Sequence, residues 1–290
     1  MIPSLRAQAL AALCLPCPTQ KCEAVQALSA AQAGGATQLD PAEALQPTQE
    51  QQASLPGRPA LPALVPPGSV AQRSPHTPEG LAALVHAICH IEFNAINLAL
   101  DAVWRFPGMP VPYYTQWLQV AREEAYHFGM LRELLQSLPH PTGQCYDYGS
   151  FTAHDGLWAM CEKTAHNMTA RMALVPRTLE ARGLDATPLI QAKLRKVGTP
   201  QALRAVDILD IILRDEVGHV AVGNHWYGWL CQQQGLEPLA HYRVLARQHQ
   251  APRLKPPFNQ EARRRAGFTE QEMTDLVELG NPENPAPAAA

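Results

Sequence analysis

Two short stretches of the chain pair a glutamate with a histidine three residues later. They are Glu124 with His127 and Glu216 with His219. Residues three apart lie on one face of an α-helix, so each pair can direct a carboxylate oxygen and an imidazole nitrogen at the same point. These two ligand types together suit a transition metal such as iron or manganese. Each stretch therefore offers half of a metal site, provided that it is helical.

Two further glutamates, Glu92 and Glu180, alternate with these pairs along the chain. The resulting order is Glu, Glu-x-x-His, Glu, Glu-x-x-His, which is the ligand set of a di-iron carboxylate four-helix bundle. The four carboxylates carry a charge of −4, which two Fe²⁺ ions balance. A single Glu-x-x-His has a plain alternative, the solvated face of a helix. Two of them in apolar segments are more specific, because a buried carboxylate is costly unless it is paired or metal-bound.

The first Glu-x-x-His and its partner glutamate are predicted to lie level on a helical hairpin. From Glu92 the chain runs 14 residues to Phe106, turns at Pro107–Pro110, and takes 13 residues from Val111 to Glu124. At a rise of about 1.5 Å per residue, each leg is about 20 Å long. The two glutamates therefore return to the same height.

The second half repeats this arrangement. From Glu180 the chain runs 17 residues to Val197, turns at Gly198-Thr199-Pro200, and takes 16 residues from Pro200 to Glu216. The two legs are again nearly equal, so a second hairpin is predicted to bring Glu180 and Glu216 to one level.

Glycine and proline residues interrupt the second half. Pro176 is expected to kink the third helix one turn before Glu180. Gly183 and Pro188 predict a break or bend just after Glu180. The predicted helices after the first one are 112–138, 153–182, 187–197 and 200–234, the last ending at Gly235.

Length and composition bound the class of protein. The chain has 290 residues, is 46% hydrophobic and carries a net charge of −3, which suits one substantial core with tails. No apolar run reaches the roughly 18–20 residues of a membrane span, so we expect a cytoplasmic protein with no membrane partner. The seven cysteines are an odd number and suit a reducing compartment better than a disulfide framework.

We expect four regions along the chain. Residues 1–76 form an N-terminal helix and a Pro/Ala/Gln-rich arm or linker, lying as a strap on the domain surface. An all-α four-helix bundle of 77–235 follows, starting at Thr77 as N-cap and Pro78 as the first helical residue. Residues 236–280 form a basic extension packed on the bundle, and 281–290 a disordered tail.

Two clusters leave alternatives open. Cys14, Cys17 and Cys22 could bind zinc or be free thiols. The segment 241–265 holds one acid, Glu261, against seven basic residues, which are Arg243, Arg247, Arg253, Lys255, Arg263, Arg264 and Arg265. We favour a structural arm with solvated charges. The alternative is a basic lip that attracts a nucleotide, RNA or phosphate ester.

Over about residues 78–270, the ligand pattern resembles the ferritin-like di-iron superfamily. The strings His90-Ile91-Glu92, 170–185, 214–220 and Lys255-Pro256-Pro257-Phe258-Asn259 look like one bacterial branch of it, catalogued as a domain of unknown function. Residues 1–75 carry no such match. The resemblance implies a ferritin-like bundle and the metal ligands, but no particular reaction.

The resemblance also implies roles for individual residues. Glu124 and Glu216 would bridge two metal ions, with Glu92 and Glu180 as terminal ligands, although spacing alone leaves this assignment open. Asp215 would orient a ligand histidine by a hydrogen bond, with a surface charge as the alternative. Tyr126 could be a redox or hydrogen-bonding partner of the ligands, with core packing as the favoured alternative. His90 points away from Glu92 on the helix and is expected to be an ordinary core or surface histidine.

We therefore expect an O₂-activating di-iron oxidase or oxygenase of the hydroxylase type. Its cofactor would be two Fe ions, with Mn as the alternative, and its substrate an unidentified small molecule or nucleotide-like compound. An electron-donor protein is an expected partner, and the protein should be a monomer or dimer. Two alternatives are iron storage with peroxide detoxification, and a bundle that binds metal for stability alone.

Overall fold

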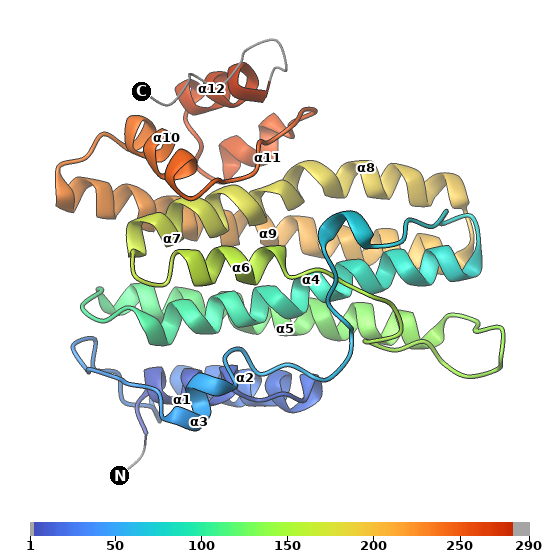
Figure 1. Ribbon diagram of the computed structural model, residues 1–290, viewed down its shortest axis with the longest axis horizontal. Helices are drawn as coiled ribbons and strands as arrows, with labels where there is room; N and C mark the ends of the chain where they lie inside the picture. The colour runs from blue at the N-terminus through green and yellow to red at the C-terminus, as the bar shows by residue number, and fades with distance from the viewer. Residues whose placement is uncertain (1–2, 281–290) are drawn as a thin grey trace. The chain divides into compact units, whose positions relative to one another are not determined.

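A computed structural model describes residues 3–280, with side chains to residue 277. These residues form helices joined by loops and no strand, which confirms the all-α class (Figure 1). The predicted tail 281–290 lies outside the described residues. The helices are α1 (Leu5–Leu13), α2 (Pro18–Ala33), α3 (Gln49–Ala53), η1 (Pro67–Ser69), α4 (Pro78–Arg105), α5 (Val111–Ser137), α6 (Gly156–Lys163), α7 (Met168–Leu174), η2 (Val175–Glu180), α8 (Ala181–Val197), α9 (Pro200–Gln234), α10 (Pro238–Gln248), α11 (Gln260–Arg265) and α12 (Glu270–Gly280).

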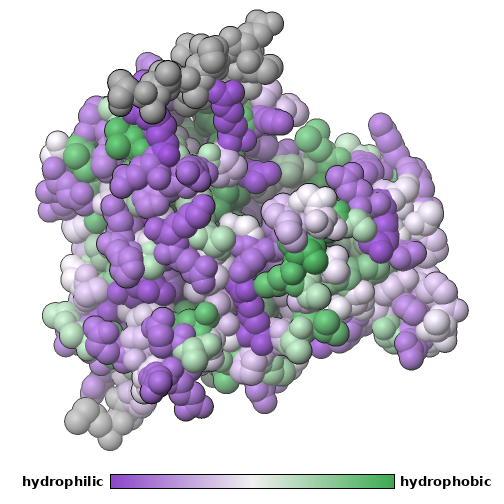
Figure 2. Space-filling view, in the orientation of Figure 1, coloured by the Kyte–Doolittle hydropathy of each residue, from purple (hydrophilic) through white to green (hydrophobic). Residues whose placement is uncertain are grey.

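The chain divides into two compact units. Unit 1 comprises Met1–Ala159 with Leu194–Ile208, and unit 2 comprises Met160–Lys193 with Leu209–Ala290. The domain boundaries predicted at residues 77 and 236 stay predictions. Figure 2 shows hydrophilic residues over much of the face in view, with hydrophobic residues in small groups between them, which is ordinary for a protein surface.

Unit 1 is built on the hairpin of α4 and α5, which lie side by side (Figure 1). The Thr77 hydroxyl accepts a hydrogen bond from the amide of Gly80, so the predicted N-cap is confirmed. At the far end, the Tyr114 hydroxyl donates to the Phe106 carbonyl at 2.8 Å and accepts from the Met109 amide at 3.1 Å. One buried tyrosine thus holds the turn that the prolines initiate.

Helix α4 is long and apolar enough to cross a membrane, so the expectation that no segment reaches this length is wrong. Of its most apolar window, 78% is buried inside the protein. Among the described residues it is the one helix that passes this test, and its burial is that of the core helix of a soluble protein.

The N-terminal region is part of the core of unit 1. Helix α1 packs against α4, and α2 packs against α5. Arg6 is buried and donates from Nη2 to the carbonyl of Trp104 at 2.7 Å. Lys21 is buried and donates from Nζ to the carbonyls of Leu13 and Gly57 at 3.0 and 2.8 Å. The buried charges fix these helices because each guanidinium or ammonium finds backbone oxygens.

The proline-rich segment lies as a strap on unit 1. The Val65 amide donates to the Ala153 carbonyl at 2.8 Å, and the Ala153 amide donates to the Ala63 carbonyl at 3.1 Å. Arg58 makes a two-pronged ion pair with Asp155 at 2.6 and 2.8 Å. These contacts hold an otherwise extended chain against the loop 148–155.

The helix predicted over 153–182 consists of α6, α7, η2 and the first residues of α8, with a break at 164–167. η2 is a π-helix, a wider turn than the α-helix, and it contains Pro176. The Thr178 hydroxyl donates to the carbonyl of Ala173, five residues earlier, at 2.8 Å. Pro176 thus lies where the regular α-helix gives way to a π turn, and a side chain satisfies a carbonyl beside it, while the kink expected at this proline stays a prediction.

The predicted break just after Glu180 and the short helix 187–197 are wrong, because α8 runs without interruption through Gly183 and Pro188. Pro188 has no N–H to give to the carbonyl of Leu184, four residues earlier. The side-chain amide of Asn259 donates to that carbonyl instead, at 3.2 Å. A donor from a distant part of the sequence thus replaces the missing backbone bond.

The C-terminal arm is held largely by its own arginines. Arg263 is fully buried and pairs with Asp185, with Nε–Oδ1 and Nη2–Oδ2 distances of 3.0 and 2.5 Å. Arg243 pairs with Asp275, and Arg264 pairs with Glu270 at 2.6 Å. The acids that neutralise the arm lie outside 241–265, which is why the segment reads as basic in the sequence. These pairs support the favoured interpretation of a structural arm, but the solvated charges expected for it are wrong at Arg263, which is buried.

Candidate metal centre

Unit 1 brings together three of the predicted ligands. Glu92 comes from α4, and Glu124 and His127 come from α5. His127 Nδ1 lies 3.2 Å from Glu92 Oε2 and 3.4 Å from Glu124 Oε2. One ligand atom of each residue lies within 4.8 Å of the others, and all three side chains are buried. The level return of the first hairpin is therefore confirmed.

Unit 2 holds the other three. Glu216 and His219 lie on α9, buried, with 3.8 Å between His219 Nδ1 and Glu216 Oε1. Glu180 is the last residue of η2 and is 9% exposed. The i, i+3 spacing thus places a carboxylate and an imidazole on one helix face here as well.

Charge governs the group in unit 1. Burial alone would lower the pKa of His127, but hydrogen bonds and attraction from Glu124 and Glu92 outweigh it and raise that pKa to about 11. The metal-free imidazole is therefore protonated at neutral pH and offsets part of the carboxylate charge. A metal ion bound at the same atoms would take over that role and release the proton.

Two residues predicted to support the ligands lie differently. Asp215 is 18% exposed in its side chain and pairs with Arg214 at 2.8 Å, and its role in orienting a histidine stays a prediction. Tyr126 is 53% exposed, with its ring centroid 6.4 Å from that of His127. The core-packing alternative for Tyr126 is therefore wrong, and its exposure gives no support to a role as a partner of the ligands.

His90 is a satisfied core histidine, as predicted. The Tyr148 hydroxyl hydrogen-bonds to His90 Nδ1 at 2.9 Å, and His90 Nε2 lies 3.1 Å from the carbonyl oxygen of His154. One turn earlier, His86 Nε2 accepts from the Gly149 amide at 3.0 Å. Burial lowers the pKa of both imidazoles to about 4, so both are neutral at physiological pH. No motif in the sequence marks the loop whose residues hydrogen-bond to these two histidines.

All seven cysteines are free thiols. Within residues 3–277, Cys14, Cys17 and Cys22 belong to none of the groups close enough to share a metal ion, so the zinc alternative gains no support. Burial raises the pKa of Cys22 to about 11, which keeps that sulfur in its weakly coordinating thiol form at neutral pH.

The fold and these groups define an all-helical protein with buried glutamates and histidines that could hold a metal ion. The chain belongs to the family described as "Protein of unknown function (DUF455)", which matches residues 14–274. It is 47% identical over 235 residues to an uncharacterized protein of Haemophilus influenzae, covering 79% of this chain and 78% of the relative. No solved structure matches the chain.

The family match corrects one expectation. Residues 1–75 were expected to lie outside the resemblance, but the match begins at residue 14. The reason is visible in unit 1, where Lys21 of α2 reaches backbone carbonyls in the core. Helix α2 thus lies within the matched region, whereas α1 precedes it.

Proposed function

We propose that this chain is a ferritin-like di-iron protein that activates O₂ to oxidise an organic substrate. The observation that carries the proposal is the buried group of Glu92, Glu124 and His127, whose ligand atoms converge within 4.8 Å. A buried cluster of two carboxylates and an imidazole is costly without a cation, and its donors are those that iron and manganese prefer.

The second ion is assigned to the other half of the ligand pattern. Glu216 and His219 repeat the carboxylate–imidazole spacing on α9, and Glu180 supplies the remaining carboxylate. Joining the two halves into one centre rests on the order of the ligands along the chain and on the resemblance to di-iron bundles. Two iron ions held by these residues would supply electrons for the reduction of O₂.

The protein's own residues set the conditions for that chemistry. The glutamates fix the charge of the site, and burial on α4 and α5 excludes water from around the three ligands of unit 1. His127 must give up its proton before its Nδ1 can bind a metal. A cytoplasmic location, a monomeric or dimeric state and an electron-donor protein complete the proposal. Manganese in place of iron is its nearest variant.

Metal analysis tests the proposal directly. The full chain, produced under iron-replete conditions, should carry about two irons per chain, with the Mössbauer signal of two coupled ions. Glu124→Ala and Glu216→Ala should each abolish that signal. Glu133→Ala, at an exposed position of α5, is the matched control and should retain it. Folded protein without iron or manganese, unchanged by either site substitution, would refute the proposal.

The same preparation separates the two alternative functions. Iron storage predicts a large cage and many irons per chain, and a purely structural metal predicts no consumption of O₂. An enzyme predicts a monomer or dimer whose reduced form consumes O₂. Size-exclusion chromatography with light scattering and an oxygen electrode distinguish these outcomes.

A further inference from the structure

Unit 2 contains a cavity of about 310 Å³ whose lining includes none of the predicted metal ligands. It lies between α10, α12 and the segment 250–254, with Arg177 of η2 in its lining. Its volume is at the lower end of the range of small-molecule sites. Neither the ligand pattern nor the family match assigns a role to it.

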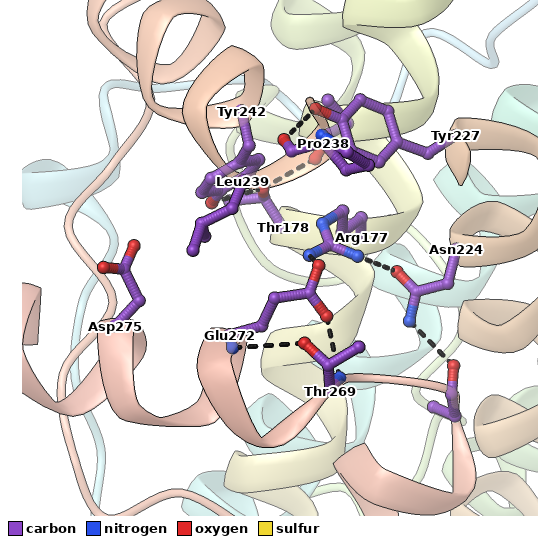
Figure 3. A network of polar contacts seen from close by, with 12 residues as sticks. Arg177, Thr178, Asn224, Tyr227, Pro238, Leu239, Tyr242, Thr269, Glu272 and Asp275 are labelled. Carbon is purple, nitrogen blue, oxygen red and sulfur yellow. Dashed lines mark hydrogen bonds and ion pairs between the residues drawn. The ribbon is translucent and has the colours of Figure 1, made fainter. Parts of the chain in front are cut away.

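Arg177 is rigidly held at this cavity. Its side chain is 6% exposed and donates from Nη1 to Asn224 Oδ1 at 2.8 Å and from Nη2 to Glu272. Asn224 in turn donates to the carbonyl of Ala266 at 2.7 Å. Figure 3 shows Arg177 between Asn224 and Glu272, with Tyr242 close by. The guanidinium is therefore already oriented before any ligand arrives.

Aromatic rings surround the same guanidinium. The ring centroids of Phe268, Tyr227 and Tyr242 lie 4.8, 5.2 and 5.5 Å from Arg177 Cζ. Phe268 and Tyr242 also line the cavity, together with the aliphatic side chains of Leu239, Leu254 and Leu276. The cavity wall is thus apolar and partly aromatic, and suits an apolar or flat molecular body.

Charge distinguishes this cavity from a simple packing gap. Its lining holds four arginines (Arg177, Arg243, Arg247 and Arg253) and two acids (Glu272 and Asp275). Glu272 pairs with Arg177, and Asp275 pairs with Arg243. Arg247 is exposed and has no acidic partner among the described residues. The exposed guanidinium of Arg247 in the lining favours an anionic group on the ligand.

We propose that this cavity binds a small organic anion, with its apolar body against Tyr242, Phe268 and Leu254 and its phosphate or carboxylate group at Arg247. An inorganic anion would use the charge but not the wall, and a neutral apolar compound would use the wall but not the charge. The proposal goes beyond the proposed function and does not depend on metal at the Glu/His groups.

Binding of defined probes to the full chain tests the site. Phenyl phosphate and octanoate combine an apolar body with an anion, whereas inorganic phosphate and phenol each lack one of these. By isothermal titration calorimetry, at least one of the first two should bind at least ten-fold more tightly than both of the last two. Preference for phenyl phosphate points to a phosphate ester as the natural ligand class, and preference for octanoate to a carboxylic acid.

Substitutions locate the binding. Arg247→Ala should weaken binding of the preferred probe about five-fold or more, since it removes a charge-assisted hydrogen bond. Arg204→Ala, at an exposed arginine of α9 that does not line the cavity, is the control and should leave the affinity unchanged. Equal affinity for inorganic phosphate and phenyl phosphate, no binding of either organic anion, or an unchanged affinity in Arg247→Ala would each overturn the proposal.

Discussion

Gly223 of α9 lies directly against the proline of the π-helix. A Cβ atom at this position would lie 2.5 Å from both Cβ and Cγ of Pro176. The ring of Pro176 is part of its backbone, so it has no flexible end that could move aside. Gly223→Ala must therefore displace η2, the turn that ends in Glu180.

The size of this effect can be isolated with a second glycine on the same helix. Gly228 has nothing within 4 Å of an added Cβ. Gly228→Ala should therefore stabilise the protein by up to about 1 kcal/mol, because alanine loses less backbone entropy in a helix. Gly223→Ala gains the same term and also suffers overpacking of about 1–3 kcal/mol. The difference in unfolding free energy between the two variants should thus be about 1–3 kcal/mol.

The assay is urea unfolding followed by circular dichroism, with iron content measured on the same samples. Gly223→Ala should unfold at lower urea than Gly228→Ala and should also bind less iron, because Glu180 moves with η2. Equal midpoints for the two variants would refute the steric reasoning. A lower midpoint with full iron content would support the steric contact between Gly223 and Pro176 but would show that the metal site does not depend on it.

Three further outcomes follow from contacts elsewhere in the protein. Asn259→Ala should lower the unfolding free energy by about 2 kcal/mol. It removes the N-cap of α11, and it removes the donor to the Leu184 carbonyl, which Pro188 cannot supply. A change below about 0.5 kcal/mol would contradict this. Burial lowers the pKa of His86 and His90 to about 4, so their contribution to the unfolding free energy is complete above about pH 6.5 and is lost as the pH falls toward 4. The urea midpoint should therefore drop between pH 7 and pH 5. The drop should be smaller in His90→Asn. The pKa of His127 is raised to about 11 in the metal-free protein, so metal affinity should rise with pH. Calorimetry at pH 8 in two buffers should detect a proton released on metal binding. This proton release should be absent in His127→Gln.

The parts of the fold that could be predicted depend on local rules. The level of Glu92 and Glu124 follows from a fixed helical rise and from a turn marked by prolines, and both hold within unit 1. The start of α4 follows from Thr77 and Pro78, whose capping preferences act over one turn. Where neighbouring residues alone decide the geometry, the sequence pattern is sufficient.

The missed parts depend on contacts between residues far apart in the chain. Pro188 reads as a helix breaker because its compensating donor, Asn259, comes much later in the sequence. The basic segment 241–265 reads as unpaired because Arg243 and Arg263 find their acids elsewhere. The burial of Lys21 could not be predicted from the sequence, because it depends on hydrogen bonds to the carbonyls of Leu13 and Gly57 that only the fold places nearby.

The π-helix also changes the helical phase of the chain. Successive residues of an α-helix advance by about 100°, and the wider π turn takes up one extra residue, so residue positions counted at that step are displaced by one beyond η2. Residues of α8 that a regular helix would place on the same face as Met172 of α7 are therefore displaced by one position. In this respect η2 behaves as a one-residue insertion that the wide turn absorbs, and deleting one residue between 175 and 179 would leave a regular helix with Glu180 still on its present face. A relative with an uninterrupted α-helix here would align with this chain only across a one-residue gap.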